Sequence, residues 1–209
     1  MALPHSDLDS DISPLVSDDE DEDNIFSRSW NDSDVVLVLG KEKFHVHRCI
    51  LSLQSPVFKA MLNGNFKDAK QDEVELKGDK YEAMVQFLKL LYPKNMLNED
   101  NGRVKINDEN VFEILEVADK YAAINVIKQC MRKPERLKPE NAMGILPYAA
   151  RHELPVEILE NIFDIIARRI SIKELENFAP QLSNDTVYKQ CLVGKCRYLE
   201  KRFPRNWKS

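Results

Sequence analysis

The sequence predicts an α+β fold, a small sheet packed with helices, followed by an all-α helical extension. The sheet is indicated by a continuous apolar and largely β-branched run at 35–39, which a Gly-Lys pair closes. The extension is indicated by the helical spacing of the apolar residues beyond Pro134 and Pro139. The chain has 209 residues, of which 43% are hydrophobic, so it can bury one substantial core or two small ones.

Residues 1–24 form an acidic segment with nine Asp and Glu side chains and no Lys or Arg. We expect this tail to be disordered, because it has too few large apolar groups to offset the entropy cost of ordering. An acidic start is also the opposite of a signal peptide or a mitochondrial presequence. No apolar run approaches the roughly 20 residues that span a bilayer. We therefore expect no membrane contact and a cytoplasmic or nuclear location.

We expect order to begin near Ile25 and to continue into a β-hairpin. The run 35–39 predicts a first strand that is buried on both faces, and Phe44 and Val46 belong to the returning strand. Two short helices follow, at 48–53 and 56–62. Between them Ser55 can cap the second helix, and Pro56 fits the first turn of that helix.

The remaining elements follow from apolar spacing and from helix start and stop signals. A short strand is predicted at 74–76, and a helix at 81–92 that Pro93 ends. Asn107 or Asp108 can cap the next helix. The further predicted helices are 111–122, 124–131, 142–150, 156–170, 172–178 and a segment through 199 that Ser183 caps.

The sequence carries no pattern that is typical of an enzyme, a cofactor site or a metal site. Its six glycines are too far apart for a phosphate-binding loop, and neither a G-x-S-x-G elbow nor an H-E-x-x-H helix occurs. The four cysteines form no C-x-x-C pair, which favours reduced thiols. We expect no catalysis, no cofactor and no metal.

Basic residues gather near the C-terminal end, where 195–208 holds six Lys and Arg side chains and one acid. We interpret this stretch as a solvated helix face. Nucleic-acid binding would need interleaved stacking aromatics or a reading helix. The three aromatic residues Tyr198, Phe203 and Trp207 are only a weak indication of this, so nucleic acid is not an expected partner.

Three consecutive stretches, 33–39 (SDVVLVL), 44–51 (FHVHRCIL) and 55–62 (SPVFKAML), resemble the BTB/POZ domain. The resemblance continues in the same order through 74–76, the helix that ends in LLY at 90–92, and 118–122 (ADKYA). It implies a BTB/POZ domain at 25–133, preceded by the tail 1–24. The second half, notably 146–154 (LPYAARHEL), is similar to a shortened BACK-type helical extension, which we place at 134–209.

The resemblance implies protein–protein interaction without catalysis, and the layout is most similar to that of MATH-plus-BTB ubiquitin-ligase adaptors, although this sequence has no MATH-like stretch. Such adaptors dock on cullin-3 through the helix corresponding to the one that ends in Met61 and Leu62, and through a hydrophobic-x-Glu signature after it. Here that signature reads Phe66-Lys67-Asp68. Phe66 can fill an apolar cleft, and Asp68 keeps the charge but is one methylene shorter than Glu. In the other interpretation Phe66 packs on its own domain.

The resemblance also implies a homodimer. Family dimers use a helix ahead of the first strand, and the candidates here are Ile25, Phe26 and Trp30, whose apolar groups would be buried best against a second subunit. Asp34 and Arg48 can pair at one end of the hairpin. In some BTB dimers this region forms a charged pocket, and otherwise the pair is a local surface ion pair.

Two functions remain open at this level. The first is a substrate adaptor of a cullin-3 ubiquitin ligase, which presents a substrate protein that the sequence does not identify. The alternative is a non-catalytic dimeric BTB scaffold or a transcription-linked regulator that binds no cullin. The alternative is favoured by Asp68, by the acidic tail and by the basic C-terminal end.

Overall fold

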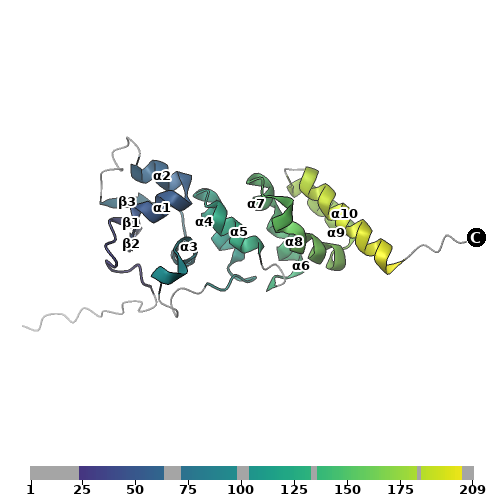
Figure 1. Cartoon of the computed structure of the whole chain (residues 1–209), viewed down its shortest axis with the longest axis horizontal. Helices are drawn as coiled ribbons and strands as arrows, with labels where there is room; N and C mark the ends of the chain where they lie inside the picture. Colours follow the sequence, from purple (N-terminus) through teal and green to yellow (C-terminus); the bar gives the residue numbers. More distant parts are fainter. Residues whose placement is uncertain (1–23, 64–71, 98–103, 133–135, 183–184, 204–209) are drawn as a thin grey trace, which may run out of the picture.

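The structure is a computed structural model that describes residues 24–63, 72–97, 104–132, 136–182 and 185–203. These residues form an elongated molecule. The sheet lies at one end, the last helix lies at the other, and the remaining helices are arranged between them (Figure 1). The predicted α+β fold with a helical second half is confirmed.

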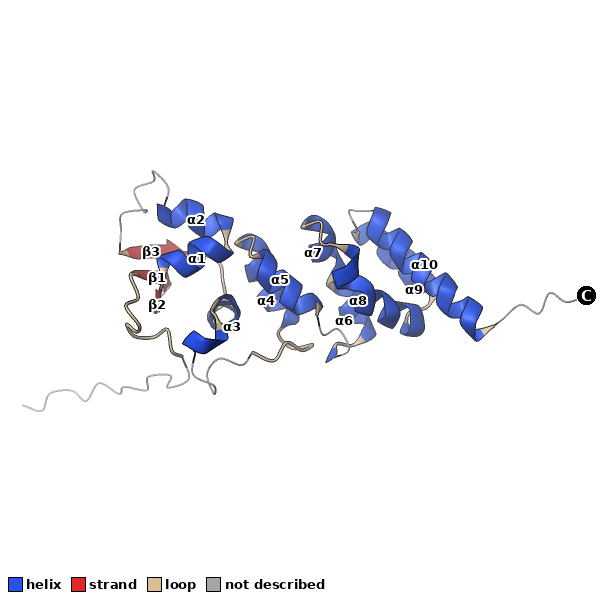
Figure 2. Cartoon of the chain, in the orientation of Figure 1, coloured by secondary structure: helices blue, strands red, loops and turns tan. Residues whose placement is uncertain are grey.

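A three-stranded sheet forms the first end of the molecule (Figure 2). Its strands are β1 (Val35–Leu39), β2 (Glu42–Val46) and β3 (Glu73–Leu76), in the order β2-β1-β3. β1 pairs with β2 antiparallel and with β3 in parallel. The hairpin turn uses Gly40 with φ of 65°, a left-handed conformation that glycine adopts readily at the first position of a two-residue loop.

Only one face of β1 carries buried side chains, so the prediction of burial on both faces is wrong. Val35 and Leu37 are at most 2% exposed, whereas Val36 and Val38 on the opposite face are partly exposed. The reason is the composition of the neighbouring strands. Val36 and Val38 pair with polar or charged residues on both sides, namely His45, Lys43, Glu73 and Glu75. These side chains keep that face of the sheet open to solvent.

Helices make up most of the rest of the described chain. Most of the bounds agree with the apolar spacing to within a few residues, because prolines, a serine cap and polar breaks mark the ends. The helices are α1 (Arg48–Gln54), α2 (Pro56–Asn63), α3 (Tyr81–Leu91), η2 (Lys94–Met96), α4 (Val111–Lys120), α5 (Ile124–Met131), α6 (Pro139–Gly144), α7 (Leu146–Arg151), α8 (Val156–Arg169), α9 (Ile172–Phe178), η4 (Ala179–Gln181) and α10 (Asp185–Arg202).

Three local predictions need correction or qualification. The single helix expected at 142–150 is divided into α6 and α7 at Ile145, because Pro147 has no backbone N–H to continue the helical hydrogen bonds. The Asn107 side chain accepts the backbone N–H groups of Glu109 and Asn110, so it caps the turn ahead of α4. Asp108 instead bonds to the extension. Ser183, the predicted cap of α10, lies outside the described residues.

Ser55 and Tyr121 join the second helix of the sheet-bearing part to the end of α4. The buried Ser55 hydroxyl accepts the N–H of Phe58 at 3.0 Å, which confirms the predicted cap, and donates to the Tyr121 carbonyl at 2.5 Å. The Tyr121 ring stacks on Phe58 with centroids 4.3 Å apart. Its phenol O–H donates to the Asp79 carboxylate at 2.8 Å. Burial, with this bond, raises the pKa of Tyr121 far above its usual value, so the phenol stays protonated.

One hydrophobic core runs through the whole described chain, from Phe26 to Cys191. The helix α5 connects its two parts, since it packs against α3 and α4 in the sheet-bearing part and against α7 and α8 in the extension. Farther along, α10 packs on α8, and the Lys195 ammonium donates to the carbonyls of Ala167 and Ile170 at 2.8 and 2.6 Å. This satisfies carbonyl groups at the C-terminal end of α8 that have no helical partner.

Two carboxylates of the sheet-bearing part fasten the extension from outside. Asp108 accepts the N–H of Lys138 and the side-chain amide of Asn141, both at 2.8 Å, and the Lys138 N–H holds the pKa of Asp108 below its usual value. Asp119 binds the Arg151 guanidinium and the His152 imidazole. The two parts are therefore held by polar contacts as well as by their shared core.

The two connections α4–α5 and α7–α8, here called corners, have the same backbone conformation. Ala122 and Glu153 both adopt left-handed φ values, 50° and 48°. The next N–H in each corner reaches back five residues, from Ala123 to Ala118 and from Leu154 to Ala149. Both corners thus close with the bond pattern common at helix C-termini, without the glycine that usually supplies it.

We expect Ser55→Ala to destabilise the fold by about 1–3 kcal/mol, because it removes a helix cap and leaves buried backbone groups unsatisfied. Urea denaturation followed by circular dichroism measures the loss. The matched control is Ser52→Ala, where the lost bond joins the partly exposed Ser52 to the exposed Asn63 at the surface. An equal effect of the two substitutions would contradict this role of Ser55.

Candidate functional site

The helices α1 and α2 present the surface on which the sequence predicts docking. Met61 and Leu62 lie in the last turn of α2, which ends at Asn63. Met61 is partly exposed, whereas Leu62 is 1% exposed and belongs to the core. Leu62 can therefore support a docking surface from beneath but offers no contact area to a partner. Phe66 and Asp68 lie outside the described residues.

Arg48 connects the two sites that the sequence predicts separately. Its backbone N–H donates to Asp34 Oδ1 at 2.8 Å, and its Nε lies 3.4 Å from the Asp34 carbonyl oxygen. Its Nη1 donates to the Leu62 carbonyl at 3.0 Å, in the last turn of α2. Each of the two contacts with Asp34 joins a backbone group of one residue to a side chain of the other, so Asp34 and Arg48 lie together, while the charged pocket stays a prediction. The guanidinium also reaches the end of α2. Arg48 holds this helix end against the first strand of the sheet.

His47 has a structural role at the junction between β2 and α1. Its Nε2 lies 2.6 Å from the Asn31 carbonyl oxygen, which can only accept, so Nε2 carries the proton. The Tyr92 hydroxyl accepts the backbone N–H of His47 at 2.8 Å and donates to Nδ1 at 3.0 Å. His47 is 7% exposed, and these bonds use both of its ring nitrogens and its backbone N–H. Burial raises the pKa of Tyr92 well above its usual value.

The segment predicted to form the dimer contact packs on its own chain. Phe26 is 0% exposed, with its ring 5.3 Å from that of Tyr92, so the expectation that Phe26 buries against a second subunit is corrected. The residues around it form turns and bends, with no helix, because they follow the edge of β2. The Phe26 carbonyl accepts from His45 N–H, and the Trp30 indole donates to the His45 carbonyl, both at 2.8 Å. Ile25 and Trp30 remain partly exposed.

Leu53 is a surface residue that was not predicted from the sequence. It lies in the last turn of α1 and is 83% exposed, the largest exposed fraction among the large hydrophobic side chains described. Ser52, beside it, is bonded to Asn63 at the end of α2. The only available signal was helical spacing, which places Leu53 on the side away from the buried Leu51. An isolated exposed leucine is common, and its position beside α2 makes it a candidate contact.

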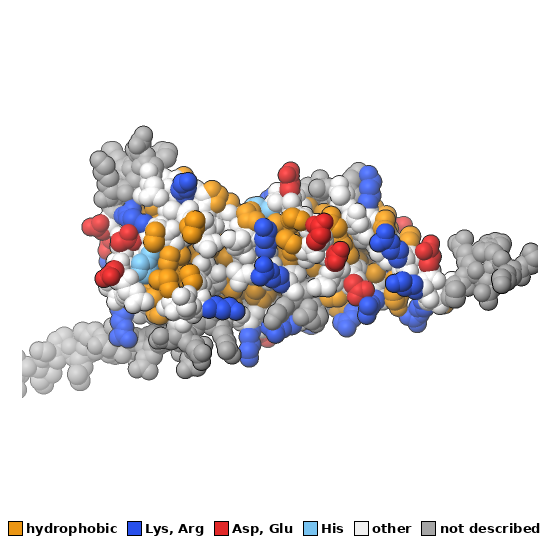
Figure 3. Space-filling view, in the orientation of Figure 1, with side chains coloured by type: hydrophobic (Ala, Val, Ile, Leu, Met, Phe, Trp, Pro, Cys, Tyr) orange, Lys and Arg blue, Asp and Glu red, His pale blue; other side chains and the backbone are white. Residues whose placement is uncertain are grey.

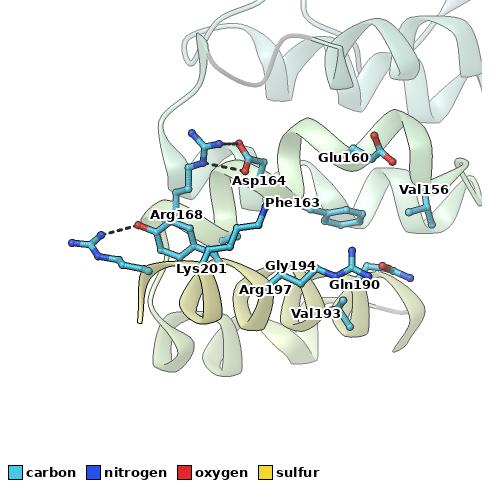
Figure 4. A pocket seen from close by; sticks show the side chains of 13 residues that line it. Val156, Glu160, Phe163, Asp164, Arg168, Gln190, Val193, Gly194, Arg197 and Lys201 are labelled. Atoms are coloured by element: carbon cyan, nitrogen blue, oxygen red, sulfur yellow. Dashed lines mark hydrogen bonds and ion pairs between the residues drawn. The ribbon is translucent and has the colours of Figure 1, made fainter. Parts of the chain in front are cut away.

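A hollow of about 730 Å³ lies between α8 and α10 (Figure 4). Arg168 and Asp164 of α8 form an ion pair at its rim, and Arg197 and Lys201 of α10 lie opposite. Figure 3 shows Lys and Arg side chains mixed with Asp and Glu over this end of the molecule. The described part of the basic C-terminal stretch therefore borders a surface of mixed charge in this hollow.

The cysteines are dispersed. Cys130 and Cys191 are buried, which raises the pKa of each thiol to about 12, and Cys49 and Cys196 are exposed.

Within the described ranges, no three His, Cys, Asp or Glu side chains come together as a possible metal site. In the same ranges no helix has the length and apolar character to span a bilayer.

The comparisons with known proteins identify the first part of the chain. Residues 24–136 match the model of the BTB/POZ domain. Kelch-like protein 24 of Homo sapiens is 32% identical over 133 residues, which are 63% of this chain and 21% of that protein. BTB and MATH domain-containing protein 38 of Caenorhabditis elegans is 34% identical over 102 residues, 49% of this chain and 24% of that protein.

The match to these relatives covers only about a fifth to a quarter of their length. Kelch-like protein 6 of Homo sapiens extends the match, at 27% identity, to 73% of this chain and 22% of that protein. Among solved structures, the BTB domain of human gigaxonin is similar to 47% of this chain and 74% of its own, with 23% identity and a TM-score of 0.37.

We expect Arg48→Met to loosen the last turn of α2, because the Leu62 carbonyl loses its charged donor while the apolar stem is kept. The cost to the fold should be about 1 kcal/mol. Hydrogen exchange should become faster at the amides of residues 61–63. Arg28→Met, at an exposed position, is the matched control. Unchanged exchange at residues 61–63 would show that Arg48 does not hold the helix end.

Proposed function

This chain belongs to the BTB/POZ domain family, and from that premise we propose that it is a non-catalytic adaptor that docks on cullin-3 and presents a substrate protein for ubiquitination. The docking surface consists of Leu53 on α1, Met61 on α2 and the loop residues Phe66 and Asp68. The proposal carries with it the location expected from the sequence, the cytoplasm or the nucleus.

The observation that carries the proposal is the fixed end of α2. Arg48 binds the Leu62 carbonyl, and Asn63 binds Ser52, so the last turn of α2 is held on two sides just before the signature loop begins. A loop that starts from a fixed helix end loses less conformational freedom on binding. Phe66 stands three residues beyond Asn63, close enough to share one contact surface with Met61 and Leu53.

Phe66 and Asp68 take different parts in the proposed contact. Burial of a phenylalanine side chain in a partner contributes about 1.5–3 kcal/mol. The Asp68 carboxylate reaches less far than the glutamate of the family signature, so we assign it a contact at the rim, where screening by water keeps its contribution small. The affinity therefore depends mainly on Phe66.

The second candidate function is a dimeric scaffold or transcription-linked regulator that binds no cullin. The feature that favours it is Asp68 in place of glutamate. Both candidates require partners to bind a folded, non-catalytic surface, and they differ only in whether cullin-3 is one of those partners. Direct binding to cullin-3 therefore separates them.

We expect the full chain to bind the N-terminal domain of cullin-3 and Phe66→Glu to weaken that binding at least about tenfold, the equivalent of about 1.4 kcal/mol. Isothermal titration calorimetry measures both affinities. Phe203→Glu is the matched control, since Phe203 is 66% exposed and directly follows α10, a helix that lies far from α2 in Figure 1. Leu53→Glu should also weaken binding if α1 belongs to the contact surface.

Two results would change the assignment. Equal affinity for Phe66→Glu and the unmodified chain would show that cullin-3 binds elsewhere. If the unmodified chain gave no heat of binding with cullin-3, the second candidate function, a scaffold that binds other partners, would replace the adaptor.

We also propose a homodimer, formed through the exposed parts of Ile25 and Trp30 on the segment that covers β2. Light scattering on the full chain should give twice the mass of one chain. Trp30→Ser should shift the mass toward that of the monomer, because Trp30 is the larger of the two partly exposed groups. A monomeric mass for the unmodified chain at all accessible concentrations would refute the dimer.

A further inference from the structure

A second hollow, of about 460 Å³, lies between the C-terminal ends of α3 and α5 and is rich in cations. Segment 104–106 and η2 complete its wall. Five cationic side chains line it, and no Asp or Glu is among the described residues of the wall; the cations are Lys89, Lys94, Lys105, Arg132 and Arg136. Figure 3 shows Lys and Arg side chains over α5 and along the lower edge of the molecule beside it. We name this site the basic hollow.

Helix ends explain part of this charge but not all of it. The C-terminal ends of α3 and α5 each carry a partial negative charge of roughly half an elementary charge, which cations stabilise. Together they amount to about one negative charge, against four cations in the described wall when Lys89, which has an interaction of its own, is left out of the balance. The basic hollow therefore keeps a positive field, and an anionic group placed in it would be attracted.

The chain itself contains a segment whose charge is opposite to that of the basic hollow. Residues 18–23 are six consecutive acids, Asp-Asp-Glu-Asp-Glu-Asp, and residues 1–24 contain no Lys or Arg. This acidic segment ends directly before Asn24, which is 6% exposed and donates to the Tyr81 hydroxyl at 2.8 Å. The fold thus fixes the point from which the acids leave the folded part.

That point lies close to the basic hollow. The Phe26 N–H is bonded to the Asn24 side chain at 3.0 Å, and the Phe26 ring packs on Tyr92 at 5.3 Å. Tyr92 in turn lines the basic hollow. Six extended residues span up to about 20 Å, so the acids can reach the cations from Asn24. The tether is short, which raises the local concentration of the acids at the site.

The basic stretch on α10 fits the same acids less well. α10 lies at the opposite end of the molecule from β1 and β2, the strands that follow Asn24 in the chain (Figure 1). Acidic side chains, Glu160 and Asp164, also stand among its cations in the hollow beside α8. The basic hollow is both nearer and more uniformly positive.

We propose that residues 18–23 bind the basic hollow of the same chain, as a tethered anionic segment that covers the surface between α3 and α5. Bound there, the segment excludes other anionic ligands from this surface. The interaction is electrostatic and depends on ionic strength, because exposed charges are screened within a few ångströms at high salt. It does not depend on docking to cullin-3.

The test is paramagnetic relaxation in the full chain, with a nitroxide on Ser17→Cys in a Cys49→Ser, Cys196→Ser background. The buried Cys130 and Cys191 stay unlabelled, because their thiols are buried and their raised pKa leaves little reactive thiolate. We expect the label to broaden the amide signals of residues 104–106 and Arg132 at low salt. The broadening should disappear at about 1 M salt, where the Debye length is about 3 Å.

Two variants remove one partner each. Reversal of three charges in the wall, Lys94→Glu, Lys105→Glu and Arg132→Glu, should abolish the broadening. Its matched control reverses three exposed charges elsewhere, Lys41→Glu, Arg169→Glu and Lys173→Glu, and should leave the broadening unchanged. Neutralising residues 18–23 to Asn and Gln should also abolish it, without altering any described residue.

Three results would overturn the proposal. They are broadening that is absent at low salt, broadening at Arg197 and Lys201 on α10 in place of the basic hollow, and broadening that persists after residues 18–23 are neutralised. A mixture of isotope-labelled chain without nitroxide and unlabelled chain with nitroxide tests contact within one chain. Broadening in that mixture would show that the acids bind a second copy, and would also overturn the proposal.

Discussion

The whole structure depends on the burial of α5 from two directions. Val126, Ile127, Cys130 and Met131 are at most 1% exposed, although the helix has only eight residues. Partners in the sheet-bearing part and in the extension share this apolar surface. Neither part could be removed without exposing α5 to water, at a cost of roughly 25 cal/mol for each Å² of apolar area. The boundary predicted between residues 133 and 134 therefore separates two parts of one core, and as a domain boundary it stays a prediction.

Local signals in the sequence predicted most of the fold. Helix bounds such as Ile124–Met131 and Ile172–Phe178 follow directly from apolar spacing and stop signals. The wrong predictions concern residues whose environment is set by strands far away in the sequence, or a helix whose backbone hydrogen bonds are interrupted. Val36 and Val38 look like buried strand residues in the sequence, and only their pairing with charged neighbours shows that they are not. Pro147 divided a helix that its apolar spacing alone would have continued.

The sequence proposes where the candidate site lies, and that location stays a prediction; the contacts that surround it could not be predicted. Resemblance in the sequence located Met61 and Leu62 on a helix ahead of the signature loop. It could not show that Leu62 is buried, that Leu53 is exposed, or that Arg48 joins Asp34 to the end of α2, because these facts depend on contacts between residues far apart in the chain. Phe26 shows the same limit. Its size suggested an interface, and tertiary packing against Tyr92 buries it within one chain.

The repeated corners at Ala122 and Glu153 give the helices the organisation of a stack. Each helix pair lies mainly against its neighbours, as in solenoid repeats. Exposed side chains of α10 that lie outside the hollow beside α8, such as Lys189 and Glu200, form a polar outer face at this end of the described stack. In such an arrangement the outermost layer has a neighbour on one side only. Local unfolding of α10 should therefore need less free energy than any other local unfolding of the described fold. The helices nearer α5 should unfold only together with the core.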